Sequence, residues 1–572
     1  MNALILAVGA GVLYLIAFHT YGKFLGKKIF RLDPDAVCPS KERQDNIDFV
    51  PTKKPILFGH HFTSIAGTGP IVGPAIAIIW GWVPALIWVL VGSIFMGAVH
   101  DFGALVVSLR SKGRSIGDIA SDLVNKRVRT LFLLIIFFEL WIVVAIFGVV
   151  IAVVFNMYPQ AVLPVWLEIP IAIWLGYMIY QKGAPHLPLS LLAVAIMYLT
   201  VIIGSYVPIK MPAIFGLNPV AAWVVVLLIY AYIASTLPVQ TLLQPRDYIN
   251  SHQLFVALGL LSLGVLVAHP TMVAPAANLN PQGAPPIWPM LFVVVACGAI
   301  SGFHSLVSSG TSSKQCDNET SALTIGYGGM LMEGMLATFV IVACGAGLAL
   351  GLVKGAETLT GAAAFSQHYA SWGAAAGLGS KVAAFVQGSA NMIERIGIPH
   401  NITVTIMGVF VVSFAATTLD TATRLQRYIV AELTTAWGFP KLARRHPATI
   451  IAVVSAFILA FYNGSGKGPL TLWPLFGSVN QLLAGLALLV VTVYLAYKKA
   501  PLAFTAIPMV FMLFMTGWAM LYNLASFYGK GNWLLFFIGL AVFILEIWMI
   551  IESVIILKNV YGEKPERVVT VR

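Results

Sequence analysis

The chain has 572 residues, of which 59% are hydrophobic and only 10% are charged, and its mean hydropathy is +0.89. A soluble domain needs about a quarter of its residues charged to cover its surface, so this composition excludes a soluble enzyme or binding module. The formal net charge of +12 does not indicate nucleic-acid binding, because the basic residues are distributed as in a membrane protein.

Apolar segments near the roughly 20 residues that cross a bilayer core recur along the whole chain. We expect about fifteen transmembrane helices, beginning near residues 3, 58, 84, 130, 162, 187, 219, 252, 288, 322, 400, 447, 470, 502 and 532. The first has no preceding basic region and no small-residue cleavage site, so we interpret it as a retained span. The four cysteines show no C-x-x-C spacing, which argues against a disulfide framework or a zinc site.

With the N-terminus placed outside, the 34 Lys and Arg residues fall mainly in cytoplasmic segments, above all 23–55, 110–129 and 424–445. The exceptions on the outer side are Lys210, Lys354, Lys381, Arg395, Lys467 and Lys530. This asymmetry is the positive-inside pattern. We therefore predict a multi-pass protein of a bacterial inner membrane, with a cytoplasmic C-terminus, the lipid bilayer as its surroundings and no nucleic-acid partner. The oligomeric state is not encoded in this pattern.

Two polar, glycine-rich stretches interrupt apolar spans, at 58–70 and at 302–313. When the stretches are aligned on His61 and His304, they match again at a Gly-Thr pair without a gap. In the predicted topology the two spans cross the membrane in opposite directions. A matched pair of broken helices of opposite direction indicates an inverted-repeat transporter with its binding site near the membrane midplane.

This repeat divides the predicted chain into five parts: an N-terminal helix with a basic loop (1–55), a first repeat (56–207), a two-helix connector (208–287), a second repeat (288–497), and two final helices with a tail (498–572). Residues 353–398 are too polar for an easy crossing, and we expect a re-entrant or surface hairpin on the outer side. The predicted fold class is an all-α polytopic membrane protein. Five spans per repeat suggest, by analogy alone, a LeuT-type 5+5 inverted repeat with discontinuous helices plus extra helices.

Breaks in the two helices free backbone N–H and C=O groups, which lipid cannot satisfy and a bound solute can. Half-helix N-termini favour an anionic group such as a carboxylate. The alternative interpretation is that the small residues only permit close helix packing, but two matched stretches, each with an intramembrane histidine, favour a site. The predicted substrate-binding residues are His61, Ser64, Gly67, Thr68, Gly69, His304, Ser305, Ser308, Ser309, Gly310 and Thr311.

Ionisable side chains inside spans are costly and commonly functional. The candidates for ion or proton coupling are Asp101, Glu139, Glu333 and Asp420, with the hydroxyls of Thr417 and Thr418. The two glutamates lie deepest and are the better proton carriers, whereas the two aspartates lie near the cytoplasm and could be solvated or paired. Hydroxyls and freed carbonyls would suit sodium. The sequence leaves proton and sodium coupling open, and it indicates no cofactor or bound metal beyond the coupling ion.

Several of these stretches resemble the carbon starvation protein A (CstA) family: 58–74, 100–102, 235–248, 308–315 and 417–424. The resemblance runs along nearly the whole chain, which is closest to a compact subgroup. It implies an inner-membrane nutrient importer of the amino acid–polyamine–organocation superfamily that acts during carbon starvation.

From the resemblance we expect a secondary transporter that takes up a small carboxylate, pyruvate first, by proton symport. The alternative is a di- or tripeptide importer on the same scaffold. An intramembrane enzyme is disfavoured because the adjacent pair His60 and His61 has no metal-binding or nucleophile motif beside it. A channel is disfavoured because no filter-like repeat is present.

Overall fold

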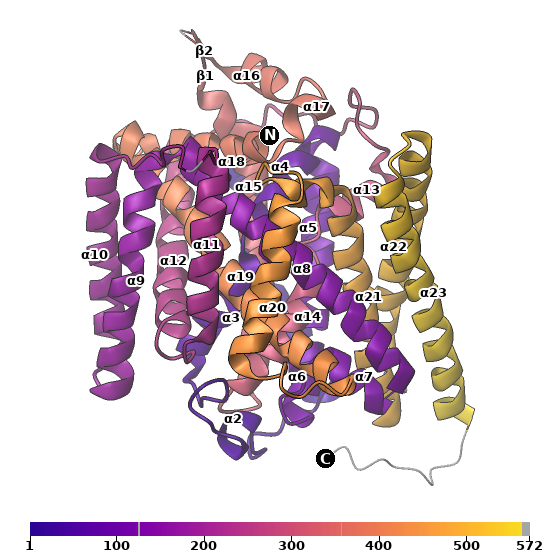
Figure 1. Cartoon of the computed structure of the whole chain (residues 1–572). Coiled ribbons are helices and arrows are strands. Elements are labelled where there is room, and N and C mark those ends of the chain that lie inside the picture. Colours follow the sequence, from indigo (N-terminus) through magenta and orange to yellow (C-terminus); the bar gives the residue numbers. More distant parts are fainter. Residues whose placement is uncertain (124–125, 215, 356, 563–572) are drawn as a thin grey trace.

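The computed structural model in Figure 1 describes residues 1–123, 126–214, 216–355 and 357–562. Within these ranges, twelve helices are long and apolar enough to cross a membrane, and a bent pair, Lys54–Ala66 with Gly69–Trp80, makes a thirteenth. Two further predicted spans correspond to shorter helices, near residues 288 and 447. The chain is therefore an all-α, multi-pass membrane protein, as the hydropathy predicted.

The first half contains twelve α-helices, several of which continue into short π-helical or 3₁₀ turns. They are α1 (Ala3–Ala17), α2 (Pro39–Glu42), α3 (Lys54–Ala66), α4 (Gly69–Ala77), α5 (Trp82–Gly92), α6 (Ala98–Arg110), α7 (Ile116–Leu123), α8 (Lys126–Met157), α9 (Val162–Gly176), α10 (His186–Tyr206), α11 (Pro219–Thr236) and α12 (Leu243–Ala268). The start of α11 illustrates how local sequence determines where a helix begins. Pro219 occupies the first turn, where no N–H is required, and the Asn218 side chain accepts a bond from the Ala221 N–H.

The second half contains eleven α-helices and one small hairpin. They are α13 (Ile287–Val294), α14 (Gly302–Gly310), α15 (Gly329–Val342), β1 (Leu352–Lys354), β2 (Glu357–Leu359), α16 (Gly361–His368), α17 (Trp372–Ala375), α18 (Leu378–Glu394), α19 (His400–Ala436), α20 (Arg445–Phe461), α21 (Trp473–Tyr497), α22 (Ala503–Gly529) and α23 (Trp533–Gly562). The strands pair antiparallel, with Val353 opposite Thr358.

The first predicted helix break is confirmed. Helix α3 ends at Gly67, whose φ of +44° and ψ of −141° suit glycine alone among the common residues, and α4 starts two residues later, bent by 44° from α3. The second break differs in position. We expected it around Gly310, but Gly310 is where α14 ends, and the unwound backbone between α13 and α14 lies upstream, at residues 295–301.

The two broken helices run in opposite directions through the bundle, with α3 and α14 toward one face and α4 and α13 toward the other (Figure 1). Their surroundings correspond as well. Helix α12 packs against α3, and α21 packs against α14. Helix α18 contacts α4, and α7 contacts α14. Helices α8 and α19 pack closely against each other. An inverted repeat would produce this exchange of partners. The 5+5 division and its boundaries remain predictions, because α12 of the expected connector also packs inside the bundle.

The described residues between 353 and 398 form a surface structure on the face that carries the N-terminus (Figure 1). The β1–β2 hairpin, α16 and α17 project from that face. Helix α18 instead packs against α4, α12 and α19, and most of its residues are buried. This segment therefore covers the end of the bundle nearest the first helix break.

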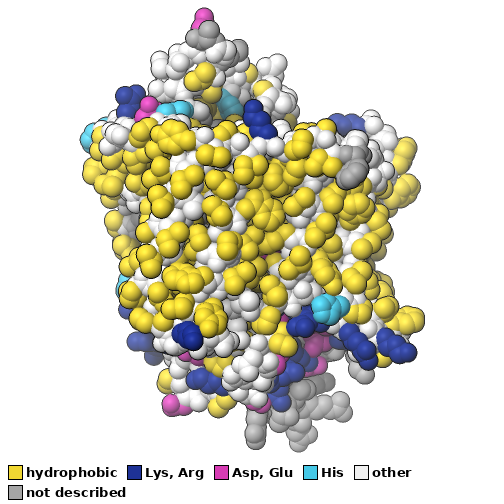
Figure 2. Space-filling view, turned by 60° about the vertical axis from the view of Figure 1, so that its left-hand side comes forward, with side chains coloured by type: hydrophobic (Ala, Val, Ile, Leu, Met, Phe, Trp, Pro, Cys, Tyr) yellow, Lys and Arg dark blue, Asp and Glu magenta, His cyan; other side chains and the backbone are white. Residues whose placement is uncertain are grey.

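On the face shown in Figure 2, a broad apolar band crosses the molecule, and Lys and Arg side chains gather above and below it, most densely at the lower end. At one edge of the molecule, α22 and α23 expose large apolar side chains such as Ile507, Phe514 and Phe537. Exposed residues of this kind are compatible with lipid as the surrounding solvent.

Candidate functional site

A cavity of about 520 Å³ lies between the two helix breaks. It extends from them to the face of the molecule that carries α17 and the loop between α22 and α23. Both breaks and three other helices contribute its polar lining, which includes Thr68, Gly69, Ser301, Thr418, Asn480 and Asn523. Residues of both breaks and side-chain amides and hydroxyls therefore line one space, as a site for a small polar solute requires.

The charged side chains that line this cavity, among the described residues, are both basic: Lys381 of α18 and Lys530. Lys381 is only 6% exposed, and its Nζ lies 5.2 Å from the centre of the Trp473 ring. Burial lowers the pKa of the Lys381 amine to about 8. No Asp or Glu lines the described part of the cavity. The N-terminus of α4 also faces it at Gly69, so its electrostatic character favours an anion.

A cluster of ionisable side chains centred on α14 is fully buried. His304 Nδ1 lies 3.0 Å from Asp101 Oδ2, and its Nε2 lies 3.3 Å from Glu333 Oε2. The other oxygen of Asp101 contacts His100 Nδ1 at 2.7 Å, and the Gly298 N–H donates to Glu333 Oε1 over 3.1 Å. The structure thus brings three predicted site residues from α6, α14 and α15 into one chain of groups that can hold or pass a proton.

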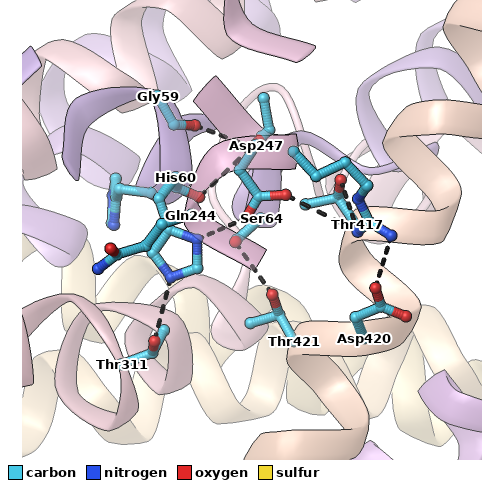
Figure 3. A network of polar contacts seen from close by, with 12 residues as sticks. Gly59, His60, Ser64, Gln244, Asp247, Thr311, Thr417, Asp420 and Thr421 are labelled. Carbon is cyan, nitrogen blue, oxygen red and sulfur yellow. Dashed lines mark hydrogen bonds and ion pairs between the residues drawn. The ribbon is translucent and has the colours of Figure 1, made fainter. Parts of the chain in front are cut away.

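A second polar network surrounds α3, and Figure 3 shows it from close by. His60 Nδ1 lies 2.5 Å from Asp247 Oδ2, and its Nε2 lies 3.2 Å from the Thr311 hydroxyl. Gln315 donates to the same hydroxyl over 2.9 Å, and Gln244 donates to the Gln315 carbonyl oxygen over 2.5 Å. The network ties the end of α14 to α3 and α12, so it links the two broken helices on the side away from the cavity.

Helix α19 contributes a buried ion pair to the same region (Figure 3). Arg246 Nη1 lies 2.6 Å from Asp420 Oδ2, and the Tyr230 hydroxyl donates to that oxygen over 2.9 Å. The Thr417 hydroxyl accepts bonds from Arg246 and Asn250, each of 3.1 Å. Of the two alternatives for Asp420, solvation or pairing, the structure shows pairing, with Arg246 of α12.

The first break contacts α19 directly. The Thr418 hydroxyl donates to the Ser64 carbonyl over 3.2 Å, and the Ser64 hydroxyl lies 3.1 Å from that of Thr421. A Cβ added at Gly67 would lie 2.6 Å from the Thr418 hydroxyl oxygen. Hydroxyl and carbonyl oxygens converge here, the ligand type that hard cations prefer.

The remaining predicted residues are buried and do not line the cavity. His61 Nδ1 lies 2.8 Å from the Ser312 hydroxyl, while the hydroxyls of Ser305 and Ser309 donate to carbonyls of their own helix. In the described part of the chain, neither the Ser308 hydroxyl nor the Glu139 carboxylate has a hydrogen-bond partner. A Cβ added at Gly310 would lie 2.3 Å from Leu425, so close helix packing, the alternative interpretation, describes Gly310.

Sequence reasoning missed several side chains of this region. Arg246 and Asp247 are absent from the predicted site, although two charged residues at the start of an apolar helix meet the rule for intramembrane charges. His60 was noticed only for lacking an enzyme motif. Cys297 and Lys381 carried no signal, because a single cysteine or an outer-loop lysine is common in any membrane protein.

Comparison with known proteins gives a consistent picture. Residues 2–519 match the family model described as carbon starvation protein CstA. The chain is 34% identical to the peptide transporter CstA of Campylobacter jejuni, over 90% of this chain and 79% of that one. It is 31% identical to the pyruvate/proton symporter BtsT of Escherichia coli, over 91% and 81%. A solved manganese transporter from Eremococcus coleocola aligns with a TM-score of 0.41 and 13% identity, over 90% and 99%; this score is too low to carry an argument.

Proposed function

Because the chain belongs to the carbon starvation protein CstA family, whose curated relatives are named transporters, we propose that it is a secondary transporter that imports a small carboxylate. Pyruvate is the first candidate and proton symport the mechanism. The observation that carries the proposal is the charge of the cavity: two lysines line it, and among the described residues no carboxylate does.

A carboxylate in this cavity gains three kinds of interaction. The ammonium group of Lys381 supplies charge, and its contact with the Trp473 ring holds it at the cavity wall. The N-terminus of α4, at Gly69, directs the positive end of its helix dipole toward the cavity. The hydroxyl of Thr418 and the amide of Asn480 add neutral hydrogen-bonding groups for a keto oxygen. Together these groups match a small anion with more than one acceptor oxygen.

A short peptide is the second candidate, because several relatives carry the name peptide transporter and the volume of the cavity exceeds the needs of a three-carbon acid. A peptide also has an ammonium group, which requires an acidic partner when it leaves water. The described lining offers none. Charge therefore favours the carboxylate over the peptide.

Proton coupling is proposed for the cluster of His304, Asp101 and Glu333. The cluster is closed to solvent, but Cys297 lies beside it and also lines the cavity. Uptake of a proton by the cluster and of an anion by the cavity would then cancel their charges within one region, which lowers the cost of carrying both through a low-dielectric interior. Sodium bound by oxygens of Ser64 and Thr418 is the alternative that the experiment separates.

We propose that the cavity faces the outside of an inner membrane, with the N-terminus on the same side and the C-terminus in the cytoplasm. The opposite face carries the basic loop before α3. There Asp48 contacts Arg424 at 2.6 Å and Arg427 at 3.0 Å, so the loop is fastened to α19. An importer that is ready to load its substrate should have a cavity open to the outside and a closed cytoplasmic side, which is the proposed arrangement here.

The test is uptake into proteoliposomes that contain the purified chain. Labelled pyruvate and a labelled dipeptide are offered separately, with an inward proton gradient, with an inward sodium gradient, and with neither. We expect accumulation of pyruvate that requires the proton gradient and collapses with a protonophore. Accumulation of the dipeptide alone would show that the substrate is a peptide and not pyruvate. Dependence on the sodium gradient would show that sodium and not the proton is the coupling ion. Uptake of neither solute would reject the proposal.

A further inference from the structure

Three side chains of different chemistry converge below the floor of the cavity. A sulfur of Cys297, a ring nitrogen of His304 and a carboxylate oxygen of Glu333 all lie within 4.8 Å of one another. His304 Nε2 and Glu333 Oε2 are 3.3 Å apart. Two ligands of a tetrahedral zinc ion, at about 2.1 Å from the metal, are separated by about 3.4 Å. The nitrogen and the oxygen therefore already have the spacing of a shared metal ion.

The other atoms of these side chains are engaged, which leaves the facing atoms available. Glu333 Oε1 accepts the Gly298 N–H over 3.1 Å, while Oε2 has no hydrogen bond in the described part of the chain. His304 Nδ1 is 3.0 Å from Asp101, while its Nε2 likewise has none. Both side chains are fully buried. Two unsatisfied polar atoms pointing at one another inside a membrane protein require a ligand or a shared proton.

The contact between Asp101 and His304 is the arrangement that orients metal-binding histidines. A carboxylate that accepts the Nδ1 proton fixes the tautomer and leaves the Nε2 lone pair for the metal. Asp101 is fixed in turn by His100 at 2.7 Å. Gly69 also contributes by having no side chain, because a Cβ there would lie 2.4 Å from Cys297 Sγ. Asp101 thus orients the histidine, and the missing side chain at Gly69 leaves room for the sulfur.

We propose that Cys297, His304 and Glu333 form a binding site for a zinc-class divalent ion, entered from the cavity. Thiolate, imidazole and carboxylate together suit zinc or cobalt and disfavour magnesium and calcium, which take oxygen ligands. Cys297 lines the cavity whereas the other two do not, so the fourth position of the ion faces the space where a solute enters. Cys297 and His304 form no known metal-binding motif, and Glu333 lies on a later helix, so sequence spacing does not predict this site.

Occupancy of this site would connect three segments: the unwound stretch 295–301, α14 and α15. If these segments move relative to one another during transport, zinc added on the cavity side should inhibit uptake. This consequence rests on the proposed function, whereas binding of the ion does not. Binding is therefore measured first, on the purified full-length chain in detergent.

The experiment titrates zinc against a competing fluorescent chelator and records the absorption spectrum with cobalt as a second probe. We expect the wild type to bind zinc and to show the thiolate-to-cobalt charge-transfer band. Cys297→Ser should lose the band and bind at least tenfold more weakly. Cys344→Ser removes a buried cysteine of α15's continuation and should change neither. Asp101→Asn, which leaves the ligands in place, should weaken binding by 10- to 100-fold.

Unchanged zinc affinity in Cys297→Ser, or a cobalt spectrum without the thiolate band in the wild type, would overturn the proposal and leave the cluster as a proton-holding group only. Size-exclusion profiles of the variants show whether each is folded, and serine is nearly isosteric with the cysteine that it replaces. In proteoliposomes, zinc should inhibit the wild type and Cys344→Ser but spare Cys297→Ser. Inhibition that persists in Cys297→Ser would contradict the site.

Discussion

Replacing Gly67 by alanine tests the first helix break, on which the cavity depends. The native φ of +44° and ψ of −141° lie in a region that costs an L-residue about 1–3 kcal/mol. The new Cβ would lie 2.6 Å from the Thr418 hydroxyl and 3.1 Å from Phe147. Thr418 must then move, and its bond to the Ser64 carbonyl is lost, at a cost of about 1 kcal/mol. The sum is a destabilisation of about 2–4 kcal/mol.

The matched control is Gly148→Ala on α8. Gly148 lies next to Phe147, and a Cβ there meets nothing within 4 Å, so alanine should stabilise the helix by up to about 1 kcal/mol. Reversible unfolding of both variants in mixed micelles, followed by tryptophan fluorescence, gives the two free energies, and uptake assays follow. Gly67→Ala should lose stability and most uptake, and Gly148→Ala neither. Equal stability and uptake in both variants would refute the strained break as a functional element.

Three further predictions concern charged groups. Lys381→Gln should raise the KM for an anionic substrate several-fold, whereas Lys381→Arg should leave the KM nearly unchanged. Because the pKa of Lys381 is lowered to about 8, the affinity of the wild type for the anion should fall between pH 7 and 9. The affinity of the glutamine variant should not change over that range. Asp420→Asn removes the nearer carboxylate from buried Arg246 and leaves only Asp247, 3.7 Å away; it should cost up to about 3–5 kcal/mol of unfolding free energy, part of which Arg246→Met should restore in the double variant. Burial raises the pKa of Asp48, but its two arginine partners outweigh that effect and hold the pKa well below its usual value. The ion pairs of Asp48 therefore contribute about 2 kcal/mol to the free energy of unfolding above about pH 4, and this contribution is lost as the pH falls below that value. The difference in stability between the wild type and Asp48→Asn should disappear over the same fall in pH.

The membrane class and the first break could be predicted because each is local. Hydropathy identifies spans one at a time, and Gly67 is followed within three residues by Gly69 and Pro70, which a continuous helix does not tolerate well. The second break could not be placed in the same way. Residues 295–301 contain one glycine, no proline and mostly apolar side chains, so they have the composition of an ordinary span, and only tertiary packing holds them unwound.

Partners of the buried ionisable residues depend on packing between segments that are far apart in sequence. His304 meets Asp101 across 203 positions and Asp420 meets Arg246 across 174, distances over which periodicity carries no information. The polar face of α14 was predicted as a substrate surface, yet several of its hydroxyls bond to their own helix carbonyls. The cavity instead uses the break before α14. A serine-rich helix face thus identified the right helix without identifying the groups that face the cavity.

The central claim is that the solute binds in the outward cavity between the two breaks, and Cys297 reports on it directly. Its thiol lines that cavity, whereas the other three cysteines are buried. A membrane-impermeant maleimide should therefore label the wild type from the cavity side and leave Cys297→Ser unlabelled. We predict that saturating pyruvate slows this labelling in proportion to its occupancy of the transporter. A labelling rate that stays the same under a solute shown to be transported would contradict the account.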